Sequence, residues 1–347
     1  MFVQALSLTV EIMSRELALE DIVTEFLLNT CRQCTRSKGK HALQAALLCG
    51  VFTTRQPHDE LEYTERIPLT TGSVAEFYIE PILPHLGDVD IMYHWNYELA
   101  IPRGHPPPTK LPAEFNNSVK VFEIIDSHLP GYVYLELRYL LSECPGEDDY
   151  KVVEYEPRQY LANRPNNNVI NIHGPAVVVH QLSESTMLSV DAVRCERCLS
   201  WPPQAADWPT RHRNYGWPDS ATLQLVVSNG CDVVPVAHRH CRQHELMGKH
   251  QWRLSFSRAE IVLINSWTPV QQIVYHMLRY LVKTERLTDC ADNTEAGTLS
   301  NYHIKTLMLW ASELKPRRRW TDDVNLVRMC VQLLHILAKW LLSLIHI

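Results

Sequence analysis

The sequence lacks several features that would narrow its class at once. It has no internal repeat and no low-complexity tract, which excludes a solenoid and a largely disordered chain. It also lacks a basic excess, because 39 acidic residues outnumber the 33 Lys and Arg and give a net charge of -6. A protein that coats nucleic acid along its whole surface would usually be basic. Any nucleic-acid binding must therefore come from a local patch.

Targeting and membrane signals are also missing. The first residues have no basic region and are soon interrupted by charges at Glu11 and Arg15, so no secretory signal is predicted. The ten cysteines are scattered instead of forming a compact framework, which suits a reducing compartment, and we expect a cytoplasmic protein. The most apolar stretch, 329–347, contains Gln332 and Lys339 and predicts an amphipathic core helix instead of a membrane span.

The periodicity of the apolar residues divides the chain into three parts. Residues 5–31 carry apolar side chains near helical spacing and predict one long helix. Short segments rich in Val, Ile and Tyr then predict strands of one sheet at 87–94, 118–125, 131–139, 176–179 and 186–193. After Trp252 the spacing is helical again, and helices are predicted at 257–265, 269–284, 300–314 and 322–342.

This order predicts an α+β lobe followed by an all-α lobe, and we place the boundary between residues 250 and 251. Thr268-Pro269 is predicted to start one helix of the second lobe, because proline suits the first helical turn. Thr321-Asp322 is predicted to cap another.

Three acids in the predicted sheet are candidates for chemistry. Asp88 and Asp90 lie two apart in one strand, so both side chains should project from the same face. Adjacent carboxylates repel unless a cation neutralises them, and oxygen ligands suit Mg²⁺ or Mn²⁺. Asp191 lies in a later apolar strand. If the two strands are neighbours, three carboxylates converge as a two-metal phosphoryl transfer requires.

A solvated strand edge or turn is the alternative for an Asp-x-Asp pair, since the pattern is common. Gly72-Ser73, upstream of the pair, favours the catalytic interpretation. Backbone amides and a hydroxyl at that position could hold a triphosphate.

Gly-Ser, then acid-x-acid on a strand, then a lone acid on a later strand is the pattern of template-independent nucleotidyltransferases. Trp-Pro pairs at 201, 208 and 217 and four longer blocks follow in family order: His173-Gly174-Pro175-Ala176, Val233-Val234-Pro235-Val236, Trp252-Arg253-Leu254-Ser255-Phe256-Ser257 and Asn301-Tyr302-His303-Ile304-Lys305-Thr306. With these blocks the chain resembles, from about residue 60 to residue 342, the metazoan branch of cyclic GMP-AMP synthase-like receptors and male-abnormal (Mab) developmental proteins.

The resemblance implies a nucleotidyltransferase-fold mixed-sheet lobe with a long N-terminal spine helix, a C-terminal all-α lobe, and an active site in the cleft between them. Gly72 and Ser73 would bind the triphosphate. Asp88 and Asp90 would bridge the metal ions, and Asp191 would be the third metal ligand and would take the proton from the attacking ribose hydroxyl.

The resemblance also places nucleotide-binding side chains on the helical side of the cleft. The members that match the family are Arg253, Ser257, Glu260 and Tyr302, whose ring would stack on a base. Two positions depart from the family: Arg279 replaces a lysine near the phosphates, and Asn301 replaces a serine beside the tyrosine. These departures put phosphate contacts and base preference in doubt.

The activity that the resemblance implies is synthesis of a cyclic dinucleotide from ATP, GTP or other NTPs with Mg²⁺ or Mn²⁺. The expected activator is double-stranded nucleic acid, with RNA favoured over DNA, and a homodimer would form on this ligand. Binding would order the loop 74–87 and so align the metal site. The rival interpretation is a catalytically silent Mab-like protein that binds partners or nucleotides.

Two basic runs are candidates for the nucleic-acid surface. The first follows the long helix and comprises Arg32, Arg36, Lys38 and Lys40. The second lies between two helices and comprises Lys315, Arg317, Arg318 and Arg319. A solvated surface is the alternative for both runs, and neither distinguishes DNA from RNA.

Cysteine and histidine clusters suggest zinc only weakly. The CxxC pairs Cys31/Cys34 and Cys195/Cys198 lie too far apart in sequence for the usual spacing of one site. A denser group could bind a metal, but its polar loop favours surface residues: His238, His240, Cys241 and His244.

Overall fold

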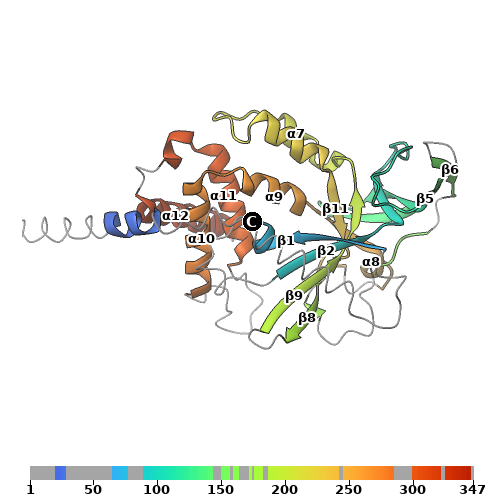
Figure 1. Cartoon of the computed structure of the whole chain (residues 1–347), viewed down its shortest axis with the longest axis horizontal. Coiled ribbons are helices and arrows are strands. Elements are labelled where there is room, and N and C mark those ends of the chain that lie inside the picture. The colour runs from blue at the N-terminus through green and yellow to red at the C-terminus, as the bar shows by residue number, and fades with distance from the viewer. Residues whose placement is uncertain are drawn as a thin grey trace, which may run out of the picture.

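A computed structural model describes residues 20–28, 65–76, 89–143, 150–156, 159–163, 172–173, 176–182, 187–241, 245–284, 299–321 and 325–344. Asp88, Cys31, Cys34, His244 and the first basic run (Arg32, Arg36, Lys38 and Lys40) lie outside these residues. The architecture is α+β. Figure 1 shows three helices gathered at one end, α10 (Pro269–Thr284), α11 (Asn301–Leu314) and α12 (Leu326–Leu344). Strands β5 (Tyr132–Glu143) and β6 (Tyr150–Glu154) lie at the other end, with β1 (Arg66–Thr71) and β2 (Val89–Trp95) between.

The smaller sheet is five-stranded and carries two of the predicted acids. Its strands, in spatial order, are β1 (Arg66–Thr71), β2 (Val89–Trp95), β9 (Met187–Arg194), β8 (Ala176–Leu182) and β7 (Ile172–His173). Strand β2 is antiparallel to β1 and parallel to β9, while β9 is antiparallel to β8.

The larger sheet is seven-stranded. Its strands are β12 (Gln251–Ser255), β11 (Cys231–Val234), β10 (Glu196–Cys198), β3 (Glu98–Pro102), β4 (Ser118–Asp126), β5 (Tyr132–Glu143) and β6 (Tyr150–Glu154). Because β12 pairs with both β11 and β5, the strands close on themselves around a core that includes Trp252. The predicted boundary at 250/251 stays a prediction, and β12, which starts at Gln251, belongs to this sheet.

The prediction of one sheet is wrong, because two neighbouring chain segments are each interrupted at matching positions. A turn at Asn96 and Tyr97 separates β2 from β3, and Cys195 separates β9 from β10. The Cys195 N–H donates to the Tyr93 carbonyl at 2.8 Å across this break. Each chain segment therefore leaves the five-stranded sheet and enters the seven-stranded one, so Asp90 and Asp191 stay in the smaller sheet.

The helical lobe contains α9 (Ser257–Asn265), α10 (Pro269–Thr284), α11 (Asn301–Leu314) and α12 (Leu326–Leu344). The first two match the predicted bounds, and α10 begins with Thr268 Oγ1 accepting the Gln271 N–H at 3.3 Å. Helix α12 begins later than predicted. Its cap is Asn325, whose Oδ1 accepts the Arg328 N–H at 2.9 Å, instead of Thr321-Asp322.

Helix α12 and residues 20–28 pack together. Residues 20–28 are helical, and Thr24 Oγ1 accepts the Leu326 N–H at 3.2 Å. Leu27 and Leu28 pack against the helical core. Helix α12 is long and apolar enough to cross a membrane, but Leu326, Leu333 and others on one face are buried in that core. The rest of the predicted 5–31 helix lies outside the described part of the chain.

The remaining described helices are short; η4 lies between α11 and α12, and the others lie between strands. They are α4 (Gly72–Ala75), η3 (Pro203–Ala205), α6 (Asp207–Thr210), α7 (Ser220–Ser228), α8 (Glu245–His250) and η4 (Arg317–Trp320).

Candidate functional site

Two of the three predicted acids are neighbours across the five-stranded sheet. Asp90 in β2 and Asp191 in β9 are Cα partners in a parallel pair. Partnered residues project from the same face, and neighbouring strands lie about 4.8 Å apart. Both residues are half-buried. The structure therefore brings these two carboxylates together, which is what the predicted metal site requires. The third predicted ligand, Asp88, lies outside the described residues.

Gly72 packs directly beneath the Asp90 carboxylate. Thr71, the last residue of β1, is the Cα partner of Asp90, so the chain turns into α4 beside that acid. Gly72 has φ +60°, and a Cβ added there would lie 1.9 Å from Asp90 Oδ2. Only glycine fits both the backbone conformation and the contact. The predicted Gly72-Ser73 pair thus adjoins the acids.

Glu76 connects this loop to the helical lobe. It follows α4 directly, is 3% exposed, and accepts a hydrogen bond from the Tyr275 hydroxyl at 2.9 Å. The other Glu76 oxygen pairs with the Lys305 ammonium of α11. Lys305 also pairs with Glu260 of α9 at 2.9 Å. One lysine therefore joins the end of the predicted triphosphate loop to two helices of the second lobe.

The charges in this cluster are fixed by their surroundings. Burial alone would lower the pKa of Lys305, but the Glu260 and Glu76 carboxylates outweigh it and raise this pKa above its ordinary value. Burial, with help from Glu76, raises the pKa of the Tyr275 hydroxyl. Lys305 stays protonated and Tyr275 stays neutral at physiological pH, so Tyr275 keeps the proton that it donates to Glu76.

Sequence reasoning identified Glu260 but missed Glu76, Tyr275 and Lys305. Lys305 lies three residues after Tyr302, one helical turn along α11, and this spacing was the available signal. The predicted loop 74–87 also begins too early. Residues up to Ala75 are in α4, whose last carbonyl accepts from Asn265 Nδ2 of α9 at 3.1 Å.

The other predicted nucleotide-binding residues lie on β12, α9, α10 and α11. Tyr302 is 65% exposed at the start of α11, and Asn301 beside it is also exposed. Arg253 is exposed on β12. Ser257 begins α9, with its hydroxyl 3.1 Å from the Ser255 hydroxyl. Arg279 is 4% exposed, and its guanidinium carbon lies 5.3 Å from the Tyr275 ring centroid.

The described residues contain no group of three or more His, Cys, Asp or Glu side chains that could hold a metal ion. Cys195 and Cys198 are buried, and Cys198 is hydrogen-bonded to Cys231. Cys241 is 3% exposed, so its prediction as a surface residue is wrong. The buried Cys241 lies in a turn, where its N–H donates a hydrogen bond to the His238 carbonyl.

Comparison with known proteins supports this fold at a coarse level. Residues 112–266 match the family described as the Mab-21 protein nucleotidyltransferase domain. The chain is also similar to "Protein mab-21-like 3" of Danio rerio, with 26% identity over 172 residues. This match covers 48% of the chain and 40% of that relative, so the chain spans less than half of the relative's length. Both findings support a nucleotidyltransferase-like fold and a relationship to the Mab-21 family.

Proposed function

We propose that this chain is a nucleotidyltransferase that binds a ligand and then makes a cyclic dinucleotide from NTPs. The observation that carries the proposal is the register of Asp90 and Asp191, two acids on neighbouring strands with Gly72 packed against one of them. Acids opposite each other in a sheet repel, and a divalent cation bound between them would offset this repulsion.

The donor set fits a divalent cation. Asp90 and Asp191 offer only carboxylate oxygens, the ligands that Mg²⁺ and Mn²⁺ prefer, and Asp88 is the proposed third ligand. When bound, such an ion supplies charge neutralisation at the transferring phosphoryl group.

The protein's own residues would bind and orient the substrates. The turn at Gly72-Ser73 would hold the triphosphate beside Asp90. Asp191 would accept the proton of the ribose hydroxyl that attacks the α-phosphorus, and pyrophosphate would leave. The exposed Tyr302 ring would stack on a base, with Arg253, Ser257, Glu260, Arg279 and Asn301 completing the proposed nucleotide site. Positioning of this kind supplies most of the catalysis in phosphoryl transfer.

Lys305 would transmit a movement of the helical lobe to the triphosphate loop. Its two acids lie on separate parts of the chain, so a shift of α11 moves both Glu76 and Glu260. We propose double-stranded nucleic acid, RNA more than DNA, as the ligand of a cytoplasmic immune-type sensor. Its surface would be the first basic run (Arg32, Arg36, Lys38 and Lys40), and two copies of the chain would assemble on it.

The test is to incubate the full chain with four labelled NTPs and Mg²⁺ or Mn²⁺. Separate reactions contain no ligand, double-stranded RNA or double-stranded DNA, beside an Asp90→Asn control. A phosphatase-resistant product that disappears in the control supports the proposal, and the reaction that yields it identifies the activator. NTP binding without turnover in every reaction would overturn the proposal in favour of a silent Mab-like binding protein.

A further inference from the structure

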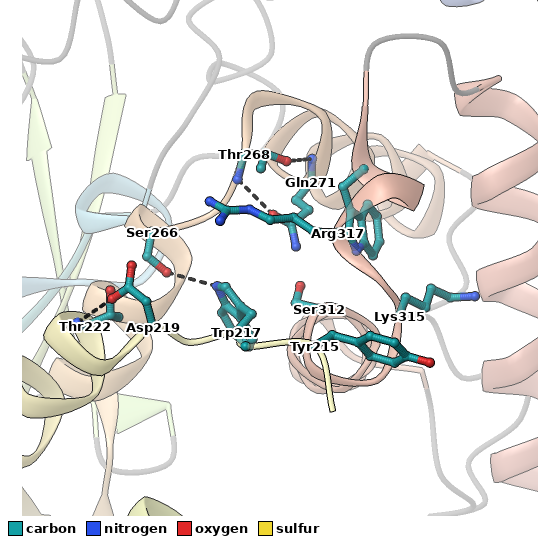
Figure 2. Close-up of a pocket in the computed structure, with 12 residues that line it drawn as sticks. Tyr215, Trp217, Asp219, Thr222, Ser266, Thr268, Gln271, Ser312, Lys315 and Arg317 are labelled. Atoms are coloured by element: carbon teal, nitrogen blue, oxygen red, sulfur yellow. Dashed lines mark hydrogen bonds between the residues drawn. The ribbon is translucent and has the colours of Figure 1, made fainter. Parts of the chain in front are cut away.

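A separate hollow lies in the helical lobe, away from the carboxylates. It forms where the loop before α7 meets the ends of α9, α10, α11 and η4. Its volume is about 40 Å³, which leaves room for a small anionic group, and its mouth is open to solvent. None of the residues proposed above for nucleotide binding lines it. Figure 2 shows Arg317, Thr268 and Gln271 on one side and Tyr215, Trp217 and Ser312 on the other.

Most polar groups of the hollow already have partners. Trp217 Nε1 donates to Ser266 Oγ at 3.2 Å, and Ser312 Oγ donates to the Met308 carbonyl at 2.7 Å. Asp219 caps α7 by accepting the Thr222 N–H at 2.8 Å. That hydrogen bond, with a smaller contribution from the Arg317 charge, lowers the pKa of Asp219, which therefore stays ionised.

Trp320 is the exception. Its side chain is buried, with 4% exposure, and lines the hollow, yet its indole Nε1–H has no hydrogen-bond partner among the described residues. A buried donor without an acceptor carries a free-energy cost, because its lost hydrogen bond to water is not replaced. An acceptor that enters the hollow would remove this cost, so the indole points to a ligand atom that accepts hydrogen bonds.

The charges around the hollow favour an anion. Its lining carries two cations, Arg317 and Lys315, against one carboxylate, Asp219. The 16-residue helix α10 also begins there, with Thr268 and Gln271 in the lining, and a helix N-terminus favours negative charge. Tyr215, 44% exposed, adds an aromatic face beside Lys315.

We propose that this hollow binds a small organic phosphate that carries a planar ring. Its oxyanion would pair with Arg317 and accept the Trp320 indole N–H, while its ring would lie against Tyr215. The long side chain of Lys315 can turn its ammonium toward the same anion. Guanidinium is the cation best matched to phosphate geometry, so Arg317 should contribute most to affinity.

The experiment follows the indole N–H signals of the full chain by NMR, with Trp320 assigned by the loss of one signal in Trp320→Phe. The probes are phenyl phosphate, inorganic phosphate and a double-stranded RNA. We expect saturable movement of the Trp320 signal, with phenyl phosphate binding more tightly than inorganic phosphate. Phosphate held at Gly72-Ser73 would not move this signal, so the result does not depend on the proposed catalytic activity.

The matched variants are Arg317→Gln and Arg318→Gln. Both remove one charge from η4, but only Arg317 lines the hollow. We expect Arg317→Gln to weaken phenyl phosphate binding by about tenfold or more and Arg318→Gln to change it by less than about twofold. Equal weakening in both variants, a static Trp320 signal, or a response to RNA alone would overturn the proposal; the last result would assign the hollow to a nucleic-acid surface.

Discussion

The two sheets treat their acidic residues differently. In the seven-stranded sheet, Asp232 is fully buried and lies 2.8 Å from Arg258, and Glu196 lies 2.7 Å from Arg194. In the five-stranded sheet, Asp90 and Asp191 are register partners of like charge. The acids of the larger sheet lie against arginines, whereas Asp90 and Asp191 lie beside each other, an arrangement that suits a bound divalent cation. We therefore expect the first group to matter for stability and the second group to matter for the proposed activity.

A large loss of activity is expected from Gly72→Ala, which tests the close approach of the site loop to Asp90. The new Cβ must displace the Asp90 carboxylate, so we expect the proposed transferase activity to fall by at least about 100-fold. The control is Gly104→Ala, since Gly104 also has positive φ (+74°) but nothing within 4 Å of an added Cβ. Both variants bear the backbone cost of about 1–2 kcal/mol, and only Gly72→Ala should lose activity.

Lys305→Met tests the connection between the site loop and the helical lobe. It leaves the buried Glu76 without its cation, and we expect the free energy of unfolding to fall by about 3–5 kcal/mol. Lys283→Met, on the exposed last turn of α10, should change it by less than about 0.5 kcal/mol. Adding Glu76→Gln and Glu260→Gln to Lys305→Met should restore part of the loss in chemical denaturation. No rescue would show that the lysine acts only through packing.

The contrast between the sheets is tested by Asp232→Asn and Asp191→Asn, which make the same chemical change in each. Asp232→Asn leaves Arg258 without its buried partner and should cost about 3–5 kcal/mol of unfolding free energy. Asp191→Asn should cost less than Asp232→Asn, because it also removes the like-charge neighbour of Asp90. Equal losses in urea denaturation would contradict the distinction between structural and functional acids.

The smallest predicted effect concerns Glu196. Burial, opposed by Arg194 and reinforced by Glu98, raises the pKa of Glu196 to about 8. Because the pKa of Glu196 is higher in the folded than in the unfolded state, protonation of Glu196 stabilises the fold. This contribution is complete below an unfolded pKa of about 4.3 and is lost as the pH rises through about 8. Between pH 6 and 8, wild type should lose about 1–2 kcal/mol more stability than Glu196→Gln. Glu114→Gln, an exposed control, should keep the wild-type slope.

The sequence predicts what depends on local contacts. The bounds of α9 and α10 follow from apolar spacing and from a cap at Thr268. The division into two sheets does not follow from such local signals, because it depends on strand breaks and on the pairing of β12 with the distant β5. The α+β class was predictable, while the sheet architecture was not.

The candidate site shows the same limit. The sequence identified Asp90 and Asp191 individually, but their pairing depends on the register of β2 and β9. Lys305 was missed because its partners, Glu76 and Glu260, are far from it in sequence and meet it only through tertiary packing.

The central claim is that Asp90 and Asp191 act as one site. The direct test is a double-mutant cycle of Asp90→Asn and Asp191→Asn, with pyrophosphate release from NTPs measured in the presence of Mg²⁺ and the activating nucleic acid. Residues that act as a unit are non-additive, so each single variant should lose about 1,000-fold or more and the double variant no more than either. Losses that multiply, or activity retained by either single variant, would contradict the account.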